Sequence, residues 1–395
     1  MPNPVTERSV GDLSSRPSKR EMLSPFVYRH GRRSLRDVPA YPLPVDLGEL
    51  NRHVLRTLIL MQIFGVPFCS TLNVPPKKVL ELACGSAFWS STCHQYLKQQ
   101  GHANVSFTGV DIAPVAPDLK KHGVNWRFIQ HDLRLPLPFE DEEFDLIFVN
   151  NEFISTVEEL HFDPDASLAR FLKPGGVVEV WKTDLQFRCL LPSPPIAVGT
   201  PDKVVEQAEK TATYTIGAGT PFAKAQNSYL RDCNPWIEKA LGRIDSTATP
   251  CALIDFNFSS DPDVFGETGG RRLAVPFGTV RWENEDAGNK RSNIRDTGNG
   301  KGVATAPTVA KQRPPPTPDQ LSLRRTALNV ILGFIEGMEP LLIKESGKTQ
   351  VEWDKWWAAM NVDLLEKDGV FNGECLEIGA WWARKKQRSW VQFSA

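Results

Sequence analysis

The chain has 395 residues, which indicates one large domain with insertions or two domains. Its formal net charge is −1, so the composition gives no sign of a nucleic-acid-binding protein. Seven cysteines form no CxxC pair and are odd in number, which indicates a reduced intracellular protein and gives no zinc motif.

The N-terminal segment lacks the apolar run of a secretory signal. Residues 1–44 are predicted to form a disordered basic arm, in which four arginines cluster: Arg29, Arg32, Arg33 and Arg36. A solvated tail is the simpler interpretation, and a nuclear-import or phosphate-binding patch is the alternative. The longest apolar run begins at Leu55 and is too short to span a bilayer. We therefore expect a soluble cytoplasmic protein, with the nucleus as a second location.

Strands and helices alternate over residues 45–190. A helix is predicted to begin near Asp46, because Asp46 and Glu49 have capping-box spacing. Buried strands are predicted at KKVLELA, VSFTGVDI, VNWRFIQHDL, FDLIFVNN and GGVVEVWKT, with helices at AFWSSTCHQYLKQQG and ASLARFLK. This alternation predicts right-handed βαβ units and a doubly wound, Rossmann-like α/β sheet.

The pattern changes after residue 190. Residues 191–283 are predicted to form a helical cap insertion, with helix starts at Thr200-Pro201 and Asn234-Pro235 and added strands at CALIDFNFS and RRLAVPFGTVRW. Residues 284–316 are polar and proline-rich, which predicts a disordered linker. Residues 317–395 are predicted to supply C-terminal helices and a last strand, CLEIGAWWARK, that completes the core.

The stretch Cys84-Gly85-Ser86-Ala87 joins the first strand to its helix. A papain-like protease requires a nucleophilic cysteine where this chain has Ala87, so a protease turn is excluded. A turn of small residues at this place lets a ligand approach the backbone, and the N–H groups at the helix start favour a negative group. Asp111 ends the second strand, where its carboxylate is placed to accept hydrogen bonds from two ribose hydroxyls.

These features together resemble one enzyme family. The pattern Glu81-x-Ala83-x-Gly85-x-Ala87 resembles the acidic, glycine-rich loop of class I S-adenosylmethionine-dependent methyltransferases. The segments FTGVDIAP, RFIQHDLRLPLPFEDEEFDLIFVNN and FLKPGGVVEVW resemble that family's later strands, and the rest of the chain is similar to fungal methyltransferase-domain proteins of unassigned substrate. The resemblance implies a seven-stranded methyltransferase sheet, S-adenosylmethionine as cofactor, and methyl transfer by direct displacement. The scattered cysteines and histidines predict no metal site.

The resemblance also implies residue roles. The residues implied to contact the cofactor are Glu81, Ala83, Gly85, Ser86, Asp111, Ile112, Asp132, Leu133, Asn150 and Asn151. The loop residues would line the methionine part, Asp111 would hold the ribose, and Asp132 would meet the adenine amino group. Glu152 and His131 are the candidate catalytic bases by position, and a structural hydrogen-bond partner and a rim residue, respectively, are the alternatives.

The two alanines depart from the family's glycines. They fit a loop in which their φ is negative, whereas a positive φ at either position would lower cofactor affinity. We expect the acceptor pocket between the fourth-strand end and the insertion, including Phe222, Tyr229 and Trp236. The tryptophan-rich segment is predicted to be a core-facing helix, with the stripe Trp353, Trp356 or Trp357, Met360 and Leu364.

Two functions stay open. The first is methyl transfer to an unidentified acceptor, either a small molecule, which is the favoured interpretation, or a protein. The second is a methyltransferase-fold regulator of fungal secondary metabolism that acts through protein partners, with its basic segments as contacts. Neither interpretation involves a membrane or nucleic acid.

Overall fold

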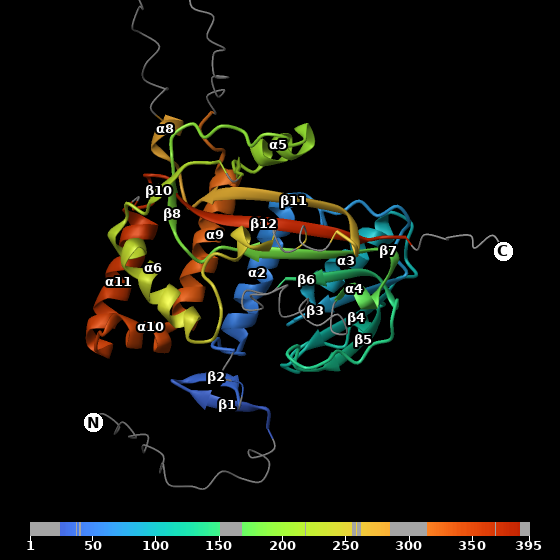
Figure 1. The fold of residues 1–395 in the computed structure, drawn as a ribbon. Coiled ribbons are helices and arrows are strands. Elements are labelled where there is room, and N and C mark those ends of the chain that lie inside the picture. The colour runs from blue at the N-terminus through green and yellow to red at the C-terminus, as the bar shows by residue number, and fades with distance from the viewer. Residues whose placement is uncertain are drawn as a thin grey trace, which may run out of the picture.

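The computed structural model describes residues 24–36, 38, 41–150, 168–217, 219–254, 258, 262–284, 314–367 and 369–387. At its centre lies a mixed sheet of ten strands (Figure 1). The strands of the main path are β5 (Asn125–Gln130), β4 (Ser106–Asp111), β3 (Lys78–Leu82), β6 (Phe144–Val149), β7 (Leu172–Thr183) and β12 (Glu374–Lys385), in that spatial order. The first five of these run parallel, and β12 runs antiparallel to β7.

The sheet continues beyond β12. The long strand β11 (Phe265–Pro276) pairs antiparallel with β12 on the side away from β7. Short strands then extend this end: β8 (Arg188–Leu190), β9 (Tyr214–Thr215) and β10 (Phe222–Lys224). The predicted doubly wound α/β fold is confirmed, and the last strand, β12, lies inside the sheet. The expected seven strands are present, but three short strands add to them.

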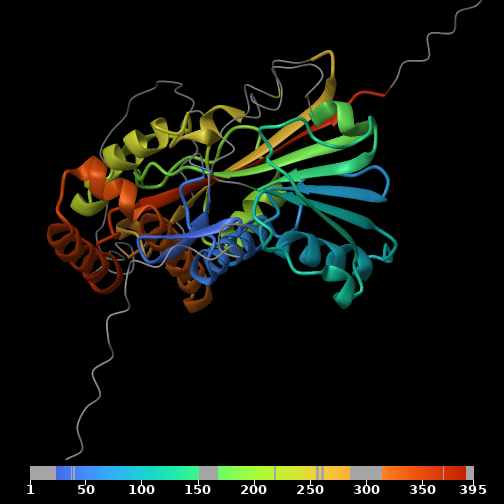
Figure 2. The same ribbon diagram turned by 90° about the horizontal axis from the view of Figure 1, so that it is seen from below.

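Helices cover both faces of the sheet (Figure 2). On one face, α2 (Leu47–Phe64), α3 (Phe88–Gln99) and α9 (Pro318–Gly337) contribute to the largest hydrophobic cluster. On the other face, α4 (Leu168–Phe171) and the short 3-10 helix η2 (Pro250–Ala252) pack on the strands. Strands buried on both sides explain why their sequences are nearly continuous apolar runs.

Helix α2 begins where the capping pattern predicted. The Asp46 side chain accepts a hydrogen bond from the Glu49 N–H, and Gly65 ends the helix in a left-handed conformation. The helix packs on α9 and α5 (Asp202–Lys210). None of the single helices in the described ranges is long and apolar enough to cross a membrane; the bent pair α9 and α10 (Glu339–Ser346) meets that test by length and composition only when combined.

Helices α6 (Ser228–Gly242), α10 and α11 (Gln350–Glu366) lie together beyond the strand ends (Figure 1). The predicted core stripe of α11 is confirmed, because Trp353, Met360 and Leu364 are buried. The predicted helix start at Asn234-Pro235 is wrong. Asn227 caps α6, and the Asn234 side chain instead bonds to the backbone of Phe187 from inside the helix.

Two further predictions need correction. The segment CALIDFNFS is not a strand where it is described: it begins within η2, because the proline at position 250 starts a 3-10 turn. The N-terminal segment differs from the predicted disordered arm over its described part. Strands β1 (Phe26–Arg29) and β2 (Arg32–Leu35) form an antiparallel hairpin. The remaining elements are η1 (Leu119–His122) and α8 (Arg281–Asn284), and the predicted linker lies almost wholly outside the described residues.

The arginines of the hairpin form hydrogen bonds that stabilise the local fold. Arg32 forms a two-point ion pair with Asp46, at 2.7 Å for both contacts. Arg33 donates to the Val45 carbonyl, and Arg36 donates to the Ser24 carbonyl. The bonds of Arg32 and Arg33 tie the hairpin to the start of α2, and that of Arg36 joins the two ends of the hairpin, so three of the four clustered arginines are engaged in local structure.

Candidate functional site

The loop between β3 and α3 has an unusual backbone. Ala83, Gly85 and Ala87 all have positive φ, at 53°, 50° and 54°. Only glycine adopts this left-handed region without a steric cost, which is on the order of 1–2 kcal/mol for other residues. The alanines therefore stand where the loop requires a glycine-like conformation, and the condition of a negative φ is not met. Beside Gly85 no further atom of the described residues lies within 4 Å of where a side-chain carbon would be, so among these residues the loop borders open space.

Asp111 fixes this loop from the tip of β4. One carboxylate oxygen accepts a hydrogen bond from the Gly85 N–H at 2.8 Å, and the other accepts one from the Ala113 N–H at 2.8 Å. Burial raises the pKa of Asp111, and these backbone donors oppose that rise. The half-buried side chain thus lies directly beside the loop, as its predicted ribose-binding role requires.

Glu81 supports the loop from below. Its buried carboxylate accepts hydrogen bonds from the Ser90 N–H at 3.2 Å and the Ser90 hydroxyl at 2.5 Å, within the first turn of α3. Burial raises the pKa of Glu81 to about 8. Cys84 is buried against Gly109, and burial raises the pKa of its thiol well above the ordinary value. A buried, protonated thiol is a packing group and not a nucleophile.

The residues after β5 lie at the rim. Asp132 pairs with Arg134 at 2.5 Å, and this guanidinium lowers the pKa of the carboxyl. Leu133 is half-buried against the second hydrophobic cluster. The His131 Nε2 lies 3.0 Å from the Pro136 carbonyl. Because a carbonyl only accepts, this contact assigns the proton to Nε2 and leaves that nitrogen unable to take another.

The end of β6 is joined to α2 by side chains. The Asn150 Oδ1 accepts a hydrogen bond from Arg56 at 2.5 Å, and its Nδ2 donates to the Thr57 hydroxyl at 3.1 Å. Arg56 also donates to the Thr183 hydroxyl at the end of β7, at 3.3 Å. All four side chains are buried. Sequence reasoning missed this network, and its one signal was polar residues on the otherwise apolar face of α2.

The other sequence-predicted residues divide into two groups. Ser86 lies half-buried in the loop, and Ile112 follows Asp111 on the same strand tip. Asn151 and the candidate base Glu152 lie outside the described residues. The structure therefore brings Glu81, Ala83, Gly85, Ser86, Asp111 and Ile112 together, whereas Asn150 faces α2 and Asp132 faces Arg134.

The hairpin covers the tip of β4. Its buried Leu35 packs in one cluster with Val45 and Ala113, and half-buried Phe26 and Ile112 pack against them. The Gln130 side chain donates to the Ile112 carbonyl at 3.1 Å and fixes the same turn. The N-terminal segment is thus part of the wall beside the loop, a role that polar composition did not predict.

The predicted acceptor pocket is not formed by its three aromatic residues. Tyr229 and Trp236 pack on Trp356, with ring centroids 5.9 and 5.1 Å apart. Phe222 lies on strand β10 under the Arg188 guanidinium, 4.5 Å from its ring centroid. The reason is that the tryptophan-rich face of α11 needs apolar partners, and α6 supplies them.

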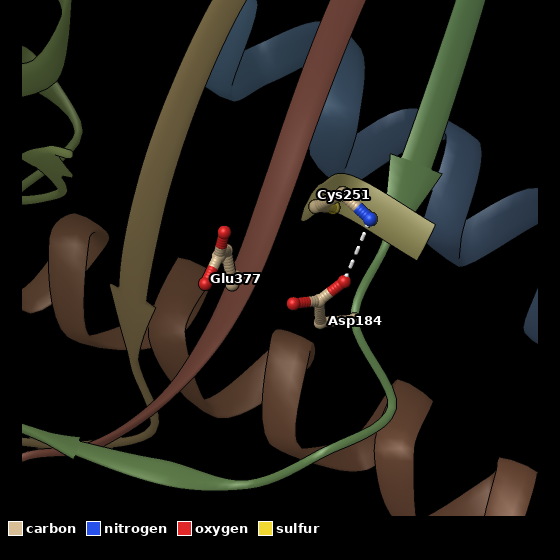
Figure 3. Close-up of side chains that lie close together, drawn as sticks. All are labelled: Asp184, Cys251 and Glu377. Carbon is tan, nitrogen blue, oxygen red and sulfur yellow. Dashed lines mark hydrogen bonds between the residues drawn. The ribbon is translucent and has the colours of Figure 1, made fainter. Parts of the chain in front are cut away.

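A second buried cluster lies at the same end of β7, where Asp184 directly follows Thr183. Asp184, Cys251 and Glu377 place one ligand-type atom each within 4.8 Å of one another (Figure 3). The Cys251 N–H donates to Asp184 at 2.9 Å. Arg188 contacts both carboxylates, and Arg272 donates to Glu377. Two guanidinium groups balance the acidic charge, so this cluster joins strands and offers no unbalanced charge for a cation.

Comparison with known proteins agrees with this geometry. Residues 79–176 match the family described as "Methyltransferase domain", and they contain the loop, Asp111 and the end of β6. The chain therefore contains a segment that matches a methyltransferase domain. No curated protein matches the chain at a significant level.

Solved structures give distant likenesses. A putative sarcosine dimethylglycine methyltransferase from Galdieria sulphuraria is 14% identical, with 86% of this chain and 85% of that chain covered and a TM-score of 0.32. Phosphoethanolamine N-methyltransferase 2 of Haemonchus contortus is 13% identical, with 90% and 62% covered and a TM-score of 0.33. A Haloferax volcanii complex of the Trm112 activator with a putative methyltransferase is 19% identical, with 35% and 57% covered and a TM-score of 0.26. The chain thus spans 57% of that Haloferax volcanii chain and 62% of the Haemonchus contortus enzyme.

The site fits the cofactor of this family, S-adenosylmethionine. Open space borders Gly85, and an acidic side chain lies within hydrogen-bond distance of the same loop. Gly85, Asp111 and Ile112 are the residues that would hold the group. The positive φ at both alanines keeps the left-handed turns that glycines would otherwise provide, at a steric cost that lowers the expected affinity relative to glycine.

Proposed function

We propose that this chain transfers a methyl group from S-adenosylmethionine to a small-molecule acceptor. The observation that carries the proposal is the loop of alternating left-handed residues, capped by Asp111, inside the segment that matches a methyltransferase domain. The loop leaves space beside Gly85, while Glu81 and Asp111 hold its two ends. Such a preformed cradle favours binding because little ordering remains to be done when the ligand arrives.

The bound cofactor supplies an electrophilic methyl group on a positively charged sulfur. The chain's task is to hold the acceptor lone pair in line with that group, and positioning of this kind supplies roughly 7–11 kcal/mol in well-aligned systems. Asp111 would orient the ribose, and Ile112 would pack against the adenine. The Asn150 side chain would act one step further away, by fixing α2 across the ends of β6 and β7.

His131 and Glu152 both remain candidate bases. The His131 Nε2 bonds to the Pro136 carbonyl beside the adenine part of the proposed site, and in this tautomer Nδ1 carries the lone pair that accepts a proton. Direct displacement needs no enzyme base when the acceptor atom carries a free lone pair, so the proposal does not depend on one.

The left-handed alanines favour one alternative function. Their steric cost weakens the loop, which fits a methyltransferase-fold protein that acts mainly through protein partners with little catalysis. An assay of methyl transfer distinguishes the enzyme from the protein that acts through partners. Methyl-labelled cofactor would be incubated with purified protein and a matched cell extract, which is then divided into small-molecule and protein fractions.

The expected result is label in the small-molecule fraction with wild type and a strong loss of label with Asp111→Asn. The control is Asp118→Asn, which removes an exposed carboxylate that caps η1 and should keep full transfer. Label confined to protein would contradict the small-molecule acceptor. Equal labelling by wild type and Asp111→Asn would contradict the site.

A further inference from the structure

A cavity of about 640 Å³ lies between the N-terminal segment and the helices beyond the strand ends. Its apolar lining includes Tyr41, Pro44, Ile244, Leu341 and Ile343. These residues come from the segment before α2, the end of α6, and α10. Small-molecule sites are typically concave, mostly apolar and about 300–1,000 Å³ in volume, so this cavity has the size and lining of a ligand site.

The hairpin presents different side chains to its two sides. Arg32 and Ser34 line the cavity, whereas Leu35 packs in the cluster that contains Ala113 and Ile112. Alternation along β2 produces this division, because successive side chains of a strand point to opposite faces. One hairpin therefore separates the cavity from the tip of β4.

The charged groups of the cavity are arranged unequally. Arg32 lines it, but its guanidinium is committed to Asp46 by two contacts of 2.7 Å. On the opposite wall, α9 and α10 meet at a bend of 72°, and this bend brings Glu336 and Glu339 into the same cavity. Glu339 accepts a hydrogen bond from the neutral Gln350 side chain at 2.8 Å. The helical wall thus presents two carboxylates, exposed Glu336 and half-buried Glu339, and neither forms a salt bridge within the described structure, although the charge of Glu336 also attracts Arg32.

Two side chains of the hairpin turn also line the cavity. Arg29 and His30 are both exposed, so water screens the charge of the Arg29 guanidinium. Half-buried Glu339 and the apolar wall beside it exclude more water than the turn does. A positive ligand group is therefore favoured on the helical side, and an apolar ring is favoured along Tyr41, Ile244 and Leu341.

We propose that this cavity binds a ring-containing amine, with its ring on the apolar lining and its ammonium group against Glu336 and Glu339. The assignment goes beyond the proposed methyl transfer, because it rests on the cavity alone. Its test needs no cofactor, so failure of one proposal leaves the other standing.

Three probes with the same ring test the proposal: tryptamine, tryptophol and indole-3-propionate, which carry an amine, an alcohol and a carboxylate. Binding to the full chain would be measured by calorimetry and ligand-observed NMR. We expect tryptamine to bind with a Kd on the order of 1 mM or tighter, tryptophol more weakly, and indole-3-propionate weakest.

Variants locate the bound probe. Glu336→Gln should weaken tryptamine roughly threefold to fivefold, and the double variant with Glu339→Gln about tenfold, with little effect on tryptophol. Glu206→Gln removes an exposed carboxylate of α5 outside the cavity and should change nothing. Ser34→Trp fills the cavity from a strand position that tolerates aromatic residues, and should block all three probes while the unfolding temperature stays near that of wild type.

Several results would overturn the assignment. These are no tryptamine binding by wild type at millimolar concentration, equal binding of the carboxylate probe, or unchanged binding in folded Ser34→Trp. A loss of tryptamine binding in Glu206→Gln equal to that in Glu336→Gln would place the amine elsewhere and would also contradict it.

Discussion

The two sides of the strand tips are built differently. At β3 and β4 the loop is held by backbone N–H groups, which donate to Asp111 and Glu81. At β6 and β7 the contacts are between side chains, where Arg56 of α2 joins Asn150 and Thr183. The first side keeps its main chain close to open space. The second side is closed by a helix that lies about 90 residues earlier in the chain.

This difference indicates that the two sides of the strand tips have different roles. A backbone cradle suits a cofactor whose shape is constant, because main-chain geometry does not depend on side-chain identity. A side-chain network suits the neighbouring wall, where α2 and the hairpin set the space next to the reacting groups. The comparison also identifies the weak point of each side, which is steric strain at the alanines and burial of polar groups beneath α2.

The largest expected effect is on the pH dependence of stability, and it comes from Glu81 on the cofactor side. Burial raises the pKa of its carboxyl from the ordinary 4.5 to about 8, so the folded chain keeps a proton that the unfolded chain releases between these values. The resulting stability is complete below about pH 4.5 and is lost as the pH rises through about 8. We expect the free energy of unfolding of wild type to fall from about pH 6 to about pH 9 relative to that of Glu81→Gln, measured by urea denaturation.

Asp184→Asn is the matched control for that measurement. Burial, followed by repulsion from Glu377, raises the pKa of Asp184 to about 7. This variant should make the fall below about pH 7 shallower, because Glu81 still contributes there, and leave the part between about pH 7 and 8 unchanged. If Glu81→Gln followed wild type at every pH, the carboxyl beneath the loop would be ionised, and the proposed support of α3 by a protonated Glu81 would be wrong.

Asn150→Leu tests the helix side. The variant removes the partner of Arg56 and Thr57 in a buried place, so we expect the free energy of unfolding to drop by about 2 kcal/mol. Asn125→Ala, at an exposed position of β5, should change it by less than about 0.5 kcal/mol. An unchanged stability combined with weaker cofactor binding would show instead that Asn150 contacts the cofactor directly.

Ala83→Gly should give the smallest change in the free energy of unfolding, and this change should be a gain. Glycine removes the cost of the left-handed backbone, on the order of 1–2 kcal/mol, but adds entropy to the unfolded chain worth about 0.4–1 kcal/mol. We expect a net gain of roughly 0.5–1 kcal/mol in thermal or urea unfolding, and tighter cofactor binding. Ala87→Gly should gain less, because the fully buried Ala87 methyl group also loses its packing.

A loop alanine with ordinary backbone serves as the control. Ala116 has no positive φ, so Ala116→Gly should lower the free energy of unfolding by roughly 0.5 kcal/mol. If Ala83→Gly lowered stability as much as Ala116→Gly does, the loop would not carry the strain described above.

The cofactor side was predictable because its signals are local. Small residues after a buried strand, and an acid at the end of the next strand, fix Gly85 and Asp111 relative to one another through the parallel pairing of β3 and β4. The sign of φ at Ala83 was not predictable, since alanine usually avoids that region and only the neighbouring turn imposes it.

The helix side was not predictable, for physical reasons that particular residues show. Arg56 lies in an apolar helix, and the residues next to it in the sequence do not indicate that Asn150 is its partner. Tyr229 and Trp236 were expected near the acceptor. In the structure they pack on the aromatic face of α11, because that face provides the larger apolar contact. In the sequence the hairpin arginines resemble a basic tail, whereas in the structure they pair with Asp46 and with backbone carbonyls.

Cofactor binding tests the central claim most directly: that a loop with two left-handed alanines is a working cradle. S-adenosylhomocysteine, the product form, would be titrated into wild type and Asp111→Asn by calorimetry, with circular dichroism to verify folding. The account predicts micromolar binding by wild type and a loss of about tenfold to a hundredfold in the variant, from the weakened charge-assisted hydrogen bonds. No binding by folded wild type at millimolar concentration, or equal binding by both proteins, would contradict it.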